Sequence, residues 1–135
     1  MCRSDYRYTF NIEEKTWDEA QKTCKLNGGN LATITSQEEQ NIIMAAADTA
    51  KQWWIGVKVN ATDRITLYLA HGQTRSTWSN WNLEAKEPNS LSEGDSCVRM
   101  KIQDNVWKWS DAFCRKKYGF ICGHEYGEKS LCYMN

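Results

Sequence analysis

Residues 109–122 read WSDAFCRKKYGFIC, and this segment says more about the fold than any other part of the chain. Residues 118–122 form a short run with the length of a buried strand, and residues 106–109, which lead into the stretch, predict another strand. Two cysteines, Cys114 and Cys122, lie within it. How these cysteines are used, together with the others in the chain, determines the class of protein.

The chain has six cysteines, an even and rather high number for 135 residues. They are Cys2, Cys24, Cys97, Cys114, Cys122 and Cys132. No two of them have the Cys-x-x-Cys spacing of a zinc knuckle, and a cytosolic enzyme of this length rarely carries six thiols. Disulfide bonds are therefore the better interpretation, and they indicate a secreted or extracellular protein. The glycosylation sequon at residues 60–62 agrees with that location.

The composition is that of one globular domain spanning residues 1–135. Hydrophobic residues make up 41% and charged residues 25% of the chain, as in ordinary folded domains. Lys and Arg total 17 and so do Asp and Glu, which gives no basic surplus for binding nucleic acid or an anionic membrane. The longest apolar stretch is too short for a transmembrane segment.

The first half of the chain predicts a strand and two helices. Aromatic and polar residues alternate over residues 6–10, as in a half-buried strand. Thr16–Glu19 has the pattern of a capping box that begins a helix, and the Asn-Gly-Gly of residues 27–29 ends it. A second capping box at Ser36–Glu39 begins another helix, which apolar residues at helical spacing extend to Ala50.

The second half predicts strands separated by a long irregular region. Residues 53–57 form an apolar run typical of a buried strand, and residues 98–102 alternate as a half-buried one. Between them, residues 58–96 show little periodicity. Irregular regions of this length inside a compact domain are uncommon and are often functional. The order of elements predicts an α+β fold.

With these elements in place, the chain resembles a C-type lectin-like domain from Tyr6 to Cys122. The resemblance is carried by Cys24 in the first helix, residues 54–57 (WIGV), residues 87–89 (EPN), Cys97, residues 109–114 (WSDAFC) and residues 119–122 (GFIC). It implies two helices, two small antiparallel sheets, and a long loop that binds calcium and ligand, all held by disulfides.

The resemblance also implies how the cysteines pair. The pairing of this family gives Cys24–Cys122 and Cys97–Cys114. Cys2 and Cys132 lie outside the shared core. Because the first and last strands of this fold lie side by side, we expect Cys2 and Cys132 to bridge within one chain, while a bridge to a second copy, and hence a homo-oligomer, stays open.

One calcium ion is the cofactor that the resemblance implies, held by Glu87, Asn89, Asp95, Ser110 and Asp111. Pro88, the only proline of the chain, separates the first two of these residues, and in the family its cis peptide bond directs both side chains to one ion. Ser110 replaces the usual asparagine and is a shorter, poorer ligand, so we expect weak binding to which Glu93 could contribute.

Sugars are the implied ligands, and the residues expected to contact them are Glu87, Asn89, Asp95, Trp107, Ser110 and Asp111. The Glu-Pro-Asn order is associated in the family with equatorial 3- and 4-hydroxyl groups, as in mannose, fucose or N-acetylglucosamine. Trp107 could stack on the sugar ring. The expected partners are glycans or glycoproteins of microbial or cell surfaces.

Three alternatives bear on this interpretation. A second calcium site is not expected, because Val59 and Ser96 stand where acidic ligands would be and only Asp63 is suitable. Enzyme activity is not expected either, because neither histidine lies near a matched acid or nucleophile. The remaining alternative is a domain of the same fold that binds a protein or another non-sugar ligand, which Ser110 favours.

Overall fold

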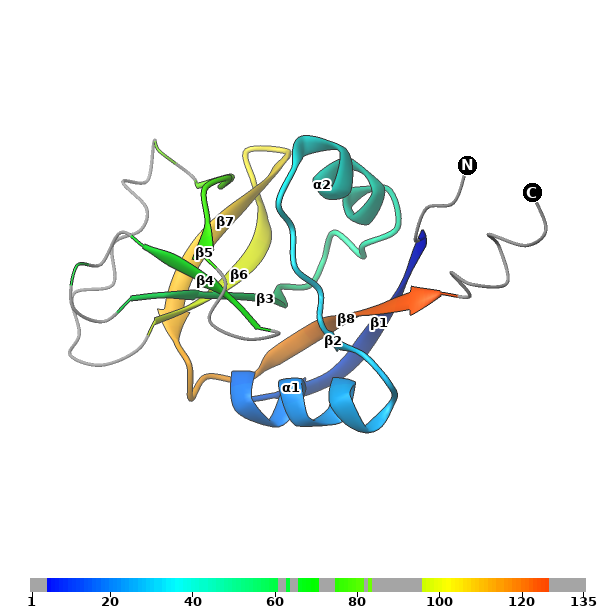
Figure 1. Ribbon diagram of the computed structural model, residues 1–135. Helices are drawn as coiled ribbons and strands as arrows, with labels where there is room; N and C mark the ends of the chain where they lie inside the picture. Colours follow the sequence, from blue (N-terminus) through cyan, green and yellow to red (C-terminus); the bar gives the residue numbers. More distant parts are fainter. Residues whose placement is uncertain are drawn as a thin grey trace.

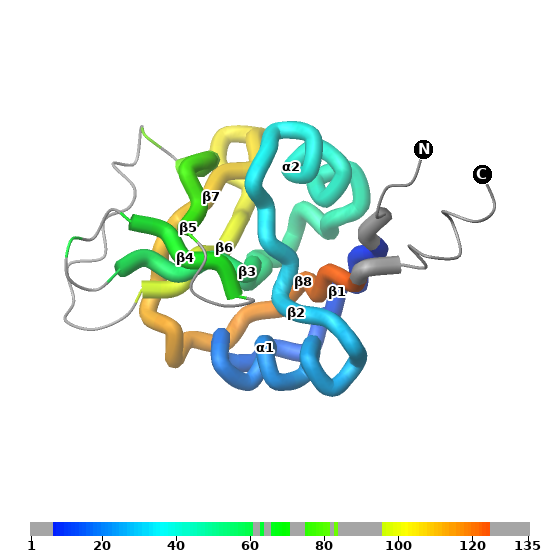
Figure 2. The backbone as a smooth tube through the Cα atoms, viewed as in Figure 1, coloured from blue at the N-terminus to red at the C-terminus, as the bar shows by residue number. Residues whose placement is uncertain are grey.

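The computed structural model describes residues 5–60, 63, 66–70, 75–81, 83 and 96–126. The elements are β1 (Asp5–Lys15), α1 (Trp17–Leu26), β2 (Asn30–Leu31), α2 (Gln37–Met44), β3 (Trp53–Val59), β4 (Leu67–Leu69), β5 (Arg75–Ser76), β6 (Ser96–Gln103), β7 (Val106–Phe113) and β8 (Tyr118–Tyr126). Figures 1 and 2 show α1 and α2 at opposite ends of the strand layer, with β1 and β8 side by side between them.

The strands form one mixed sheet, in which β3 is the central strand. It pairs in antiparallel fashion with β4 and β6, and β8 runs antiparallel to β1. The expectation of two small antiparallel sheets differs from this arrangement, because a parallel pairing of Trp53 with Gly119 and Trp54 with Phe120 joins β3 to β8. Strand β3 therefore has partners on both edges. It is also buried along almost its whole length.

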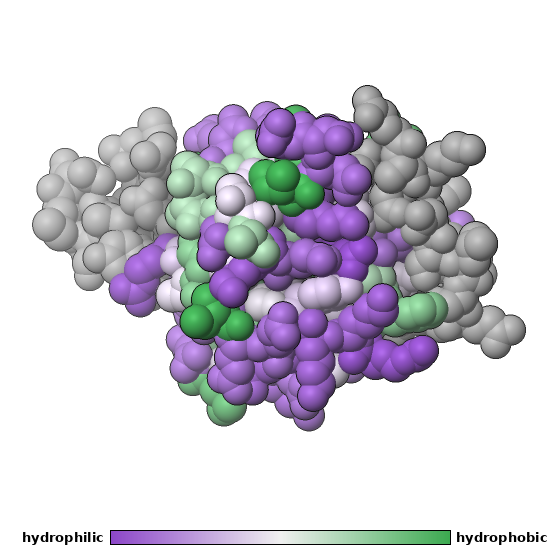
Figure 3. All heavy atoms as spheres, turned by 180° about the vertical axis from the view of Figure 1, so that it is seen from behind, coloured by the Kyte–Doolittle hydropathy of each residue, from purple (hydrophilic) through white to green (hydrophobic). Residues whose placement is uncertain are grey.

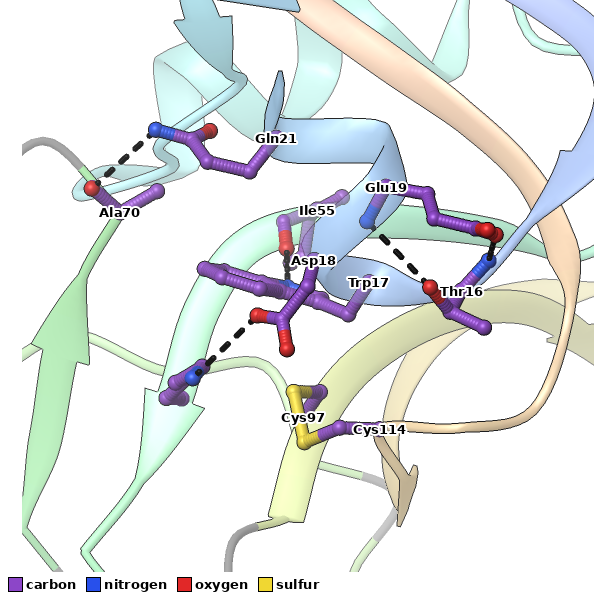
Figure 4. A network of polar contacts seen from close by, with 10 residues as sticks. Thr16, Trp17, Asp18, Glu19, Gln21, Ile55, Ala70, Cys97 and Cys114 are labelled. Carbon is purple, nitrogen blue, oxygen red and sulfur yellow. Dashed lines mark hydrogen bonds and ion pairs between the residues drawn. A yellow bond between two sulfur atoms is a disulfide. The ribbon is translucent and has the colours of Figure 1, made fainter. Parts of the chain in front are cut away.

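The predicted start and end of α1 are confirmed. The Thr16 side chain accepts a hydrogen bond from the Glu19 backbone N–H, and the Glu19 carboxylate accepts one from the Thr16 N–H at 3.0 Å (Figure 4). Asn27 caps the other end, and Gly28 follows with a φ of 85°, a left-handed value that suits glycine. Trp17 ties the helix to β3 by donating its indole N–H to the Ile55 carbonyl at 2.9 Å.

The capping box predicts a pH-dependent contribution to stability. The backbone hydrogen bond from Thr16 lowers the pKa of the Glu19 carboxyl below its ordinary value of 4.5. A group with a depressed pKa stabilises the fold above its unfolded-state pKa and loses that contribution as the pH falls through its folded-state pKa. We therefore expect Glu19→Gln to be destabilising at pH 7 and neutral in strong acid.

Urea unfolding of both proteins between pH 7 and pH 2 measures this difference. Glu38→Gln is the control, because Glu38 also lies in the first turn of a helix and makes no hydrogen bond among the described residues. A wild-type advantage over Glu19→Gln that stays constant with pH would contradict the assignment.

Helix α2 is shorter than predicted. It ends at Met44, with Ala45 as its C-cap, so the expected continuation to Ala50 is wrong. A local turn takes over beyond the helix, where the Asp48 carboxylate accepts a hydrogen bond from the Ala50 N–H at 2.9 Å and the Asp48 carbonyl accepts one from the Trp53 indole at 3.2 Å. Asp competes in this way with helical hydrogen bonding.

The second capping box is confirmed only in part. Ser36 accepts a hydrogen bond from the Glu39 N–H, as predicted. The Glu39 carboxylate, however, bonds to the backbone N–H and hydroxyl of Thr35, each at 2.8 Å. The Glu39 carboxylate therefore accepts from the backbone N–H of Thr35, whereas the capping-box pattern predicts the backbone N–H of Ser36.

The core has two clusters, and both described disulfides belong to the smaller one. The larger cluster lies between α2 and the sheet and includes Trp53, Val98 and Trp109, while the smaller one lies under α1 and includes Trp54 and Phe120. The disulfide Cys24–Cys122 joins α1 to β8 within the smaller cluster, and Cys97–Cys114 joins β6 to the end of β7. Both predicted pairings are confirmed.

The first and last strands lie side by side, as expected, and Asp5 of β1 pairs with Tyr126 of β8. Cys2 and Cys132 lie outside the described residues, so their pairing stays a prediction.

No helix in the described part of the chain is both long and apolar enough to cross a membrane.

Two strands, β4 and β5, were missed in the region expected to be irregular. They contain three and two residues, which is too short for an alternation pattern to be recognised. Leu67 and Leu69 of β4 are buried in the larger cluster. Their burial attaches the beginning of the long region to the sheet.

The surface seen in Figure 3 is mainly hydrophilic over the described residues. The strongly hydrophobic residues on this face form small, separate patches. Isolated patches of this kind are ordinary on soluble domains, whereas partner surfaces are usually larger and continuous. Over the described residues, this face therefore shows no broad apolar docking surface.

Candidate functional site

The β6–β7 hairpin carries the described part of the predicted site. Its turn is formed by Asp104 and Asn105, both with positive φ (52° and 66°), as hairpin turns of this length require. The register pairs Val98 with Asp111 and Arg99 with Ser110. The two predicted ligands on β7 are both buried, with 3% of Ser110 and 6% of Asp111 exposed.

Ser110 and Asp111 leave β7 on opposite faces of the sheet, because successive side chains of a strand alternate. Asp111 shares its face with Trp107 and Trp109, which belong to the larger cluster. Ser110 shares the other face with Ala112, which belongs to the smaller cluster. The side chains of these two predicted ligands therefore leave the strand in opposite directions.

Trp107, the residue expected to stack on a sugar, is only 6% exposed. Its ring belongs to the larger cluster, so it offers little surface to a ligand. The stacking of Trp107 on a sugar ring stays a prediction.

The other predicted ligands, Glu87, Asn89 and Asp95, lie outside the described residues, as does Glu93. Asp95 directly precedes Ser96, the first residue of β6, and Ser96 pairs with Phe113, two residues beyond Asp111. The chain thus enters β6 close to Asp111. Among the described residues, no three acidic, histidine or cysteine side chains form a group that could hold a metal ion.

Asp63, the acid considered for a second calcium site, organises a turn. Its two carboxylate oxygens accept hydrogen bonds from the Thr66 N–H at 2.9 Å and the Thr66 hydroxyl at 2.5 Å. The Asp63 N–H in turn donates to the Asn60 side chain at 3.1 Å. A local structural role accounts for this carboxylate.

An aromatic group beside Asp111 was not predicted. The Trp109 ring makes edge-to-face contacts with Trp78 at 5.5 Å and Trp81 at 5.8 Å between ring centroids. Its indole N–H donates at 2.9 Å to the side-chain carbonyl of Gln40, which is fully buried on α2. These contacts link α2, β7 and residues 77–81. The available signal was the presence of two tryptophans in an otherwise polar stretch.

Comparison with known proteins identifies the family of this fold. The family model described as "Lectin C-type domain" matches residues 13–124. The chain is 29% identical to salivary C-type lectin 2 of Aedes albopictus, over 90% of this chain and 85% of the mosquito protein. It is 28% identical to mouse C-type lectin domain family 4 member F over 85% of this chain, but this covers only 21% of the mouse protein.

Solved structures show the same fold. The C-type lectin domain of murine dendritic cell inhibitory receptor 2, solved in complex with an N-glycan, superposes with a TM-score of 0.77 at 24% identity, covering 89% of this chain and 91% of that domain. The carbohydrate-recognition domain of cow CD23, solved in the presence of a GlcNAc2Man3 oligosaccharide, gives 0.73 at 30% identity, covering 89% and 88%.

Proposed function

This chain belongs to the C-type lectin domain family, and from that membership we propose that it is a calcium-dependent carbohydrate-binding domain for mannose-type sugars. C-type lectin domains are not enzymes, and structural neighbours of this chain bind glycans. The disulfides and the salivary relative point to an extracellular location.

The position of Asp111 is the observation that carries the proposal. Its carboxylate is buried on β7, close to the point where the chain enters β6 after Asp95. Together with Glu87 and Asn89, these residues supply three carboxylates and an amide carbonyl. Calcium prefers such oxygen ligands, so the chemistry of this donor set fits the ion.

The proposed mechanism assigns separate tasks to the side chains. Bound calcium would supply coordination positions for two adjacent sugar hydroxyls. Glu87, as a carboxylate, accepts a charge-assisted hydrogen bond from one hydroxyl, whereas the Asn89 amide can also donate one. The order of this acid and this amide selects the orientation of the two hydroxyls, and Glu-Pro-Asn corresponds to equatorial 3- and 4-hydroxyl groups.

Competition for an immobilised mannose-containing glycan tests the proposal. Free mannose should displace the wild-type protein in calcium more effectively than free galactose, and a chelator should abolish binding. Retention that ignores both mannose and the chelator would refute the proposed function. Retention of a protein ligand under the same conditions would favour the protein-binding alternative.

The double variant Glu87→Gln with Asn89→Asp tests the selection step. Exchanging the acid and the amide exchanges donors and acceptors, which should shift the mannose-to-galactose preference by about tenfold or more, since one well-placed polar contact discriminates by roughly 1–3 kcal/mol. The single variant Asn89→Asp is the control for added charge. An unchanged ratio would mean that other residues orient the sugar.

A further inference from the structure

The outer edge of β7 is where the long region meets the strand that carries Asp111. Among the described strands, β7 pairs only with β6. In an antiparallel pair, alternate residues direct their backbone N–H and C=O groups toward the partner strand and away from it. The Trp109 N–H bonds to Asn80 rather than to β6, so the backbone groups of Trp107, Trp109 and Asp111 face this outer edge.

Asn80 occupies this edge with both its backbone and its side chain. Its carbonyl accepts the Trp109 N–H at 2.8 Å, and its side-chain amide donates to the Trp107 carbonyl at 3.0 Å. The next residue, Trp81, forms a parallel bridge with Trp109. One asparagine therefore satisfies two edge groups and sets the register of residues 77–81 against β7.

We propose that Asn80 is a positioning residue for the calcium and sugar site, an inference that rests on the function proposed above. Asp111 lies two residues beyond Trp109 along the same edge. Leu83 is four residues before Glu87, a distance that extended chain spans in at most about 14 Å. The register set by Asn80 thus fixes the last described part of the chain before the stretch that carries Glu87 and Asn89.

The competing explanation is that Asn80 only protects a strand edge. Unpaired edges promote association, and covering them is a common structural device. The two explanations differ in what a loss of the side chain changes. An edge-protecting residue contributes to stability with or without calcium, whereas a positioning residue also changes the calcium affinity of the folded protein.

Calcium titration of Asn80→Ala by calorimetry, combined with thermal unfolding in chelator, separates the explanations. We expect the calcium affinity of the folded variant to fall about tenfold, the effect of one lost hydrogen bond near a binding site. Ser76→Ala is the matched control. It removes a similar side-chain hydrogen bond, to the Trp78 carbonyl at 3.3 Å, which stays within the segment and does not reach β7.

The outcomes are distinct. Asn80→Ala and Ser76→Ala with equal, wild-type calcium affinity would overturn the inference, even where Asn80→Ala unfolds at a lower temperature. A wild-type protein that does not bind calcium would refute the proposed function itself. Should Asn80→Ala not fold, Asn80→Ser, whose hydroxyl is too short to span the same distance, gives the same comparison.

Discussion

Replacing Cys24 and Cys122 together by alanine is expected to lower the free energy of unfolding by about 4–5 kcal/mol, the loop-closure contribution of a crosslink between residues 98 positions apart. Both cysteines are fully buried between α1 and β8, so the loss of sulfur contacts adds to the effect. Most small domains have only 5–15 kcal/mol of stability. The variant should therefore be close to unfolding, as urea titration will measure.

The second disulfide provides the matched control. Cys97 and Cys114 are 17 positions apart, and the same chain-entropy argument gives about 3 kcal/mol for replacing both by alanine. We expect the ranking to follow loop length. Equal losses, or a larger loss for the shorter loop, would mean that packing around the sulfur atoms outweighs the constraint on the unfolded chain.

Calcium affinity is expected to fall on the order of a hundredfold in Glu87→Gln and in Asp111→Asn. Each change removes one negative charge from the proposed donor set while preserving the shape of the side chain, and the charge of the ligands tunes the affinity of calcium sites. Ser110→Ala should have a smaller effect, because Ser110 leaves β7 on the face opposite to Asp111. Calorimetry measures all three affinities.

Asp63→Asn is the control for this series. Asp63 is an exposed carboxylate whose oxygens bond within a turn, so its replacement should leave calcium affinity unchanged. Circular dichroism checks that each variant is folded. Wild-type affinity in both Glu87→Gln and Asp111→Asn would exclude the proposed site, and a loss in Asp63→Asn would indicate that the ion binds elsewhere.

Local patterns predicted the parts of the fold that local interactions determine. The capping box at Thr16 and the turn at Gly28 delimit α1 as expected, because their hydrogen bonds and backbone angles involve neighbouring residues. The end of α2 was predicted wrongly, because helical spacing continues to Ala50 although the hydrogen bonds of Asp48 form a turn there. Spacing alone does not reveal such competition.

The cysteine positions and the short motifs, in a fixed order along the chain, were enough to show the resemblance to the C-type lectin family. That resemblance implied the two disulfide pairings and the candidate ligands without any knowledge of packing. The burial of Trp107 and the opposite directions of Ser110 and Asp111 on β7 are visible only in the folded chain. The tertiary structure also placed Asn80 on the edge of β7. These features depend on contacts between residues far apart in the chain, and such contacts leave no periodic signal in the sequence.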